Sequence, residues 1–69
     1  MDNDELRPTY QVRVIEEKIA LDEKLGKLGA FLDGPASAAA KDVELLSEQR
    51  IAMATYSAIL GKRIEGFDA

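Results

Sequence analysis

The sequence predicts an all-α protein, an antiparallel two-helix hairpin that assembles into a helical oligomer. Two long segments are rich in helix-favouring Glu, Lys, Leu and Ala, and their apolar residues recur three and four positions apart. One strong break, Asp33-Gly34-Pro35, separates these segments. Because the connection is short, the two helices are expected to be antiparallel neighbours, and a second apolar stripe beside their contact predicts association with further copies.

The boundaries follow from start and stop signals in the sequence. Pro8 and Thr9 suit the first turn of a helix, Ser37 is a candidate cap, and Gly66 is a stop signal. The expected organisation is a flexible acidic arm over residues 1–8 and a hairpin over 9–67, made of a helix at about 9–33, a turn at 34–40 and a helix at about 41–65.

Each predicted helix carries one apolar seam that faces the other helix. The seam residues are Tyr10, Val14, Leu21, Leu25, Leu28, Leu32, Leu46, Met53, Leu60 and Ile64. At about 100° per residue, a second stripe falls to one side of the seam. It consists of Val12, Ile15, Ile19, Gly26, Ala30, Ile51, Ala54, Ala58 and Gly61. A lone hairpin exposes this stripe to water, so the stripe predicts contact with another copy.

Gly26, Gly29 and Gly61 lie inside the helices, where each costs about 1 kcal/mol relative to Ala, and they predict close approach of another helix.

The composition excludes several classes of function. Cys and His are both absent, which excludes disulfides, thiolate chemistry and His-assisted nucleophiles, and argues against a zinc site. We therefore expect no enzyme, no metal and no cofactor. A net charge of −4 disfavours general nucleic-acid binding. The apolar runs are too short for a membrane helix, and the acidic residues near Met1 are the reverse of a signal peptide. A cytoplasmic protein is expected.

The other flank of the hairpin holds the candidate ligand site. Its residues are Tyr10, Arg13, Glu17, Tyr56 and Arg63. Guanidinium groups suit phosphates, and aromatic rings stack on bases. A structural interpretation stands beside this one: Arg13 and Glu17, four apart, pair on the helix surface, Arg63 favours a helix C-terminus, and the tyrosines are core rings with their hydroxyls in water. The remaining acidic residues are interpreted as a solvated face: Asp22, Glu23, Asp42 and Glu44.

Several segments carry a resemblance to known proteins. These segments are Tyr10–Lys18, Leu21–Leu25, Leu45–Gln49, Met53–Ser57 and Leu60–Ile64. Their pattern, Tyr-x-x-Arg, a charged leucine helix, Gln-x-x-x-Met-x-x-Tyr and a final Arg-Ile, resembles a family of short helical proteins of tailed phages, first catalogued in crAss-like phages. The size and hairpin plan are also similar to phage anti-CBASS sponges, helical hairpins that oligomerise and sequester cyclic oligonucleotides between protomers.

The resemblance implies a phage counter-defence protein in the cytoplasm of an infected bacterial host. Such a protein binds a nucleotide-derived immune signal, a cyclic oligonucleotide or an ADP-ribose derivative, and sequesters it without chemistry. In that case Tyr10 stacks on a base, Arg13 or Arg63 holds a phosphate, and Glu17 orients an arginine. Two alternatives remain open: an acidic helical inhibitor that binds a host protein, and a purely structural helical oligomer.

Overall fold

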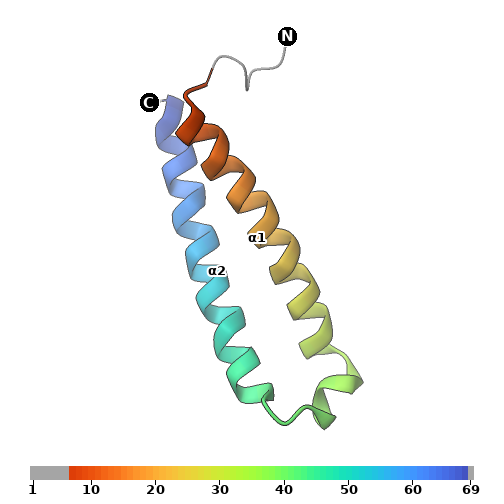
Figure 1. The fold of residues 1–69 in the computed structure, drawn as a ribbon. Helices are drawn as coiled ribbons and strands as arrows, with labels where there is room; N and C mark the ends of the chain where they lie inside the picture. The colour runs from red at the N-terminus through yellow and green to blue at the C-terminus, as the bar shows by residue number, and fades with distance from the viewer. Residues whose placement is uncertain (1–6, 69) are drawn as a thin grey trace.

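The computed structural model describes residues 7–68, and it is a helical hairpin (Figure 1). Its elements are α1 (Thr9–Asp33), the 3-10 helix η2 (Pro35–Ala39), α2 (Val43–Glu65) and the 3-10 helix η3 (Gly66–Asp68). No strand occurs in this part of the chain, so the prediction of an all-helical fold with two α-helices is confirmed. Most of the predicted acidic arm, residues 1–6, lies outside the described residues.

The ends of α1 are set by backbone and hydroxyl hydrogen bonds. At its start, the carbonyl of Pro8 accepts from the amides of Gln11 and Val12 at 3.0 and 3.3 Å. At its end, the buried Ser37 hydroxyl donates to the carbonyls of Leu32 and Gly34 at 3.1 and 2.9 Å. Ser37 therefore satisfies carbonyls around the end of α1, where the last turn of a helix leaves them unpaired, and does not cap the start of α2.

The two helices meet along the apolar seam, but they bury little of it. Within residues 7–67, the buried apolar side chains are Val14 and Leu60, and Leu60 is completely covered. Most other seam residues are half-buried, as Leu21 and Met53 illustrate. Tyr10 is 59% exposed at the open end, where its ring meets Phe67 edge-on with centroids 5.9 Å apart. A single hairpin thus covers only one stripe of each helix.

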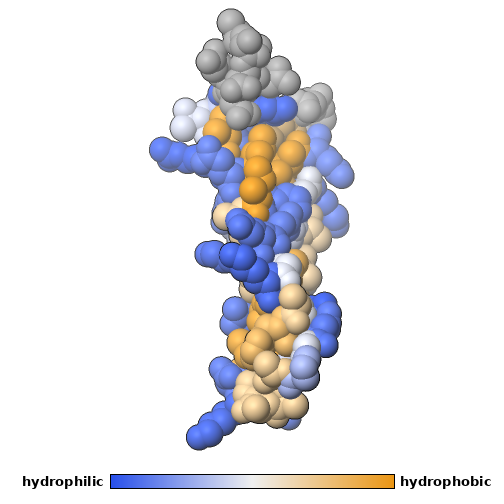
Figure 2. All heavy atoms as spheres, turned by 90° about the vertical axis from the view of Figure 1, so that its right-hand side faces the viewer, coloured by the Kyte–Doolittle hydropathy of each residue, from blue (hydrophilic) through white to orange (hydrophobic). Residues whose placement is uncertain are grey.

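Large apolar side chains remain on the outside of the hairpin. The exposed ones within residues 7–67 are Tyr10, Ile19, Phe31, Leu45, Ile51, Tyr56 and Ile59. Figure 2 shows hydrophobic atoms in the upper part and again in the lower part of the side that faces right in Figure 1, with hydrophilic side chains between and beside them. Neither α-helix combines the length and the apolar character needed to cross a membrane. An isolated hairpin does not explain why these large apolar side chains are exposed to water.

Candidate functional site

A cross-helix hydrogen bond brings two of the five predicted site residues together. The hydroxyl of Tyr56, on α2, donates to the carboxylate of Glu17, on α1. This bond raises the pKa of Tyr56 above its ordinary value of 10.0, with smaller contributions from burial and from the charge of Glu17. The positive charge of Arg63 acts in the opposite direction, which indicates that its guanidinium lies within electrostatic reach of the phenol. The side chains of three predicted site residues therefore lie near one another: Glu17, Tyr56 and Arg63.

The other two predicted site residues are Arg13 and Tyr10. The structure does not give them the purely structural roles of a surface ion pair and a core ring. Arg13 does not pair with Glu17, and within residues 7–68 it makes no hydrogen bond or ion pair. Its guanidinium is exposed one helical turn before Glu17. Tyr10 is exposed rather than a core ring, and its hydroxyl accepts from the side-chain amide of Gln11 at 3.3 Å. Arg13 thus keeps its donors available on the site flank.

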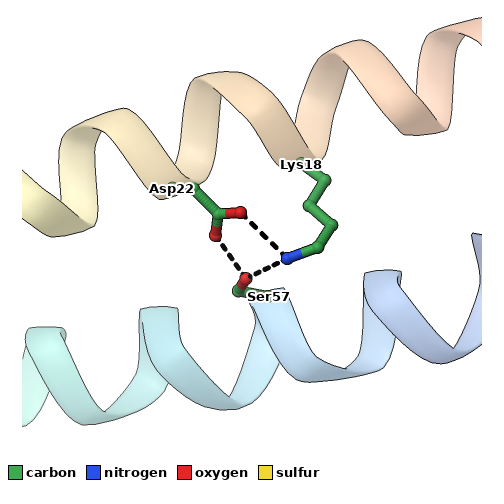
Figure 3. A network of polar contacts seen from close by, with 3 residues as sticks. All are labelled: Lys18, Asp22 and Ser57. Atoms are coloured by element: carbon green, nitrogen blue, oxygen red, sulfur yellow. Dashed lines mark hydrogen bonds and ion pairs between the residues drawn. The ribbon is translucent and has the colours of Figure 1, made fainter.

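A second polar contact joins Lys18 and Asp22 of α1 to Ser57 of α2 (Figure 3). The Lys18 ammonium donates to Asp22 Oδ2 at 2.9 Å and to Ser57 Oγ at 2.8 Å, and the Ser57 hydroxyl donates to the second oxygen of Asp22. The bond from Ser57 is the main cause that lowers the pKa of Asp22, followed by the bond from Lys18. The hydroxyl of the buried Ser57 side chain therefore both donates and accepts a hydrogen bond, and it is not left without a partner.

Asp22 lies on an exposed face, as the sequence predicts, and it also makes a contact that the sequence pattern did not predict. Asp22 is exposed, but it is tied to Ser57 on the opposite helix. Two sequence signals point to this contact: Lys18 and Asp22 are four residues apart, and Ser57 lies three residues before the buried Leu60. A serine in the apolar seam needs a partner when it is buried, and the Lys–Asp pair supplies one.

The glycines of the helices have different surroundings within one hairpin. A Cβ at Gly29 would lie 3.3 Å from the guanidinium of Arg50, which also donates to Asp33 at 3.2 Å. A Cβ at Gly61 would make ordinary contact with Lys18 at 3.6 Å, and one at Gly26 would meet nothing within 4 Å. The partner helix therefore does not approach Gly26. The expected close contact at this glycine stays a prediction about a second copy.

The exposed cluster on the Glu17 flank is suited to holding a ligand. Arg13 and Arg63 offer planar donors, Glu17 offers an acceptor, and Tyr56 offers a ring that is 41% exposed. Ser57 is no available nucleophile, because it is buried and its proton is donated to Asp22. The described residues contain no cluster of three or more acidic side chains that could hold a metal ion.

Comparison with known proteins gives one match. A family model described as Sequestin matches residues 8–66. The chain belongs to the Sequestin family. The name suggests a sequestering role, that of a binding protein rather than an enzyme, and it does not specify the ligand. No curated protein and no solved structure matches the chain.

Proposed function

We propose that this Sequestin-family chain is a phage counter-defence protein that binds and sequesters a nucleotide-derived immune signal in the cytoplasm of the infected cell. The signal is a cyclic oligonucleotide or an ADP-ribose derivative, and it is held without chemical change. The observation that carries the proposal is the exposed cluster on one flank, where the Tyr56–Glu17 hydrogen bond lies within electrostatic reach of Arg63 and Arg13 lies one helical turn before Glu17. The family name supports the sequestering part.

Each residue of the cluster has a role that its chemistry supports. Arg13 and Arg63 hold phosphate oxygens, because guanidinium groups form paired, charge-assisted hydrogen bonds with them. The exposed rings of Tyr10 and Tyr56 stack on bases, an interaction that accepts any base. Glu17 holds Tyr56 in place through the hydrogen bond between the helices. To sequester a ligand, these residues need only bind it and catalyse no step.

Binding is proposed to take place in an oligomer, through the stripe that holds Ile15, Ile19 and Ile51. Ile19 and Ile51 are 63% and 68% exposed, so the hairpin itself leaves them in water. With 25 residues, α1 is about 37 Å long. For a hairpin 21 Å across, one broad face then covers roughly 750 Å² per copy. Full contact between two such faces would bury about 1,500 Å², the size of a standard stable interface.

The oligomer is tested by sedimentation of the purified chain at micromolar concentration. Wild type is expected to sediment as a multiple of 7.6 kDa. Ile15→Asp is expected to dissociate or unfold the assembly, because it buries an unpaired charge in the contact. A folded wild-type monomer, or an Ile15→Asp variant that assembles normally, contradicts this part of the proposal.

The ligand is tested by incubating the protein with a panel of cyclic dinucleotides, cyclic trinucleotides and cyclic ADP-ribose isomers. What stays bound is released by denaturation and analysed, and it is expected to be chemically unchanged. In calorimetry, Arg13→Ala and Arg63→Ala should each weaken binding by about 1.5–3 kcal/mol per lost charge-assisted hydrogen bond. Lys27→Ala, which removes an exposed cation on the outer side of α1, is the control. Absence of heat up to about 1 mM ligand rejects the nucleotide proposal.

The second candidate is an inhibitor that covers a basic surface of a host protein. The exposed Phe31 and Leu45 and the net charge of −4 favour it, since a protein partner would bury the first and complement the second. This candidate predicts no affinity for any nucleotide of the panel. It also predicts a stoichiometric complex with one host protein that Leu45→Asp disrupts.

A further inference from the structure

Glu17 is an unexpected residue in a cluster that binds phosphate. A carboxylate repels a phosphate, and two guanidiniums alone would hold the anion better. Glu17 is nevertheless not neutralised by an ion pair within residues 7–68. In this part of the chain its hydrogen-bond partner is the neutral hydroxyl of Tyr56. Its carboxylate therefore remains exposed on the same flank as the two arginines.

The contact with Tyr56 makes Glu17 a positioned acceptor. A free glutamate on a helix surface samples many rotamers, and the hydrogen bond across the hairpin restricts this one. An ionised carboxylate accepts hydrogen bonds and donates none, and its two oxygens have room for more than one donor. The ligand atom that it meets must therefore carry a proton. The oxygens of a phosphodiester, or of the doubly esterified pyrophosphate in ADP-ribose, carry none at neutral pH, so these phosphates are not the partner of Glu17.

In a nucleotide, the hydroxyls of the ribose are donors that lie next to a phosphate. A carboxylate that accepts from a ribose hydroxyl is an established way of recognising the sugar of a nucleotide. Arg13 and Glu17 are one helical turn apart, with Cβ atoms roughly 5–6 Å from one another. The phosphate and the sugar hydroxyl of a single nucleotide can contact such a pair at the same time.

We propose that Glu17, held by Tyr56, accepts a hydrogen bond from a ribose hydroxyl of the ligand and makes the site select ribonucleotides over deoxyribonucleotides. This inference rests on the proposed function and adds the chemical class of the ligand to it. Arg13 and Arg63 supply affinity for the phosphates, and Glu17 supplies discrimination.

The test is a set of calorimetric titrations with matched ligand pairs. The pairs are cyclic di-AMP with its 2′-deoxy counterpart, and ADP-ribose with its 2′-deoxy counterpart at the adenosine sugar. For wild type, the deoxy ligand of the pair that binds is expected to be roughly 10- to 150-fold weaker, the loss of one charge-assisted hydrogen bond.

Two variants assign the discrimination to Glu17. Glu17→Ala is expected to bind the ribo and deoxy ligands of a pair with nearly equal affinity. Glu16→Ala removes the same charge from the neighbouring exposed position, and it is expected to keep the wild-type ratio. Sedimentation of both variants checks that the assembly is unchanged, which separates a binding effect from a folding effect.

The outcomes separate this inference from the proposed function. Equal binding of ribo and deoxy ligands by wild type overturns the inference, as does a ribo preference that survives in Glu17→Ala. In both cases nucleotide sequestration itself stands. If wild type binds none of the nucleotides, the proposed function fails and the inference fails with it.

Discussion

Leu60 and Leu45 form a matched pair for measuring how much the contact between the two helices contributes to the free energy of unfolding. Both are leucines of α2, yet Leu60 is 0% exposed and Leu45 is 66% exposed. Leu60→Ala removes three buried carbons, a transfer loss of about 2.4 kcal/mol at about 0.8 kcal/mol each. A small cavity term raises the expected loss to about 2.5–3 kcal/mol, near the low end for Leu→Ala, because neighbours in so thin a hairpin can relax. Leu45→Ala, with about a third of its side chain covered, should lose only about 0.8 kcal/mol.

Urea and thermal unfolding, followed by circular dichroism at equal protein concentration, measure both losses. The melting temperature of Leu60→Ala should fall by about 10–24 °C, since each kcal/mol corresponds to about 4–8 °C in a domain of this size. Leu45→Ala should shift it several times less. Equal losses for the two variants would refute the reasoning, because they would mean that Leu45 is as buried as Leu60 in the protein that unfolds.

Three further predictions concern pH and packing. Asp22 has a lowered pKa, so its contribution to stability is present above about 3.8 and is lost as pH falls through the lowered value. Ser57→Ala should raise that pKa, measured by NMR titration of the carboxyl. The pKa of Tyr56 is raised, so its contribution to stability is present below about pH 10.0 and is lost as pH rises through the raised value. Tyrosinate absorbance in a Tyr10→Phe background should show Glu17→Gln lowering this pKa. Gly26→Leu should disrupt assembly if a second copy packs there, and it should raise the melting temperature if none does.

Much of the fold could be predicted because the signals that carry it are local. Asp33-Gly34-Pro35 interrupts any helix, whatever surrounds it, so two helices and a turn follow from a few neighbouring residues. Apolar spacing identified Val14 and Leu60 as seam residues, and the structure buries both of them. The absence of Cys and His limited the chemistry without any structure. The candidate site was found as a set of residue types on one flank.

The partners of these residues depended on the tertiary structure. Glu17 has Arg13 one turn away on its own helix, yet it bonds Tyr56, which lies 39 positions along the chain. Asp22 is exposed, as predicted, but its bond to Ser57, 35 positions along the chain, was not. Helical periodicity places a residue on a face, whereas the register between two helices depends on how both seams pack together. The sequence alone therefore determined the two helices and the chemistry available to them, and packing decided that Arg13 stays open while Glu17 and Asp22 connect the helices.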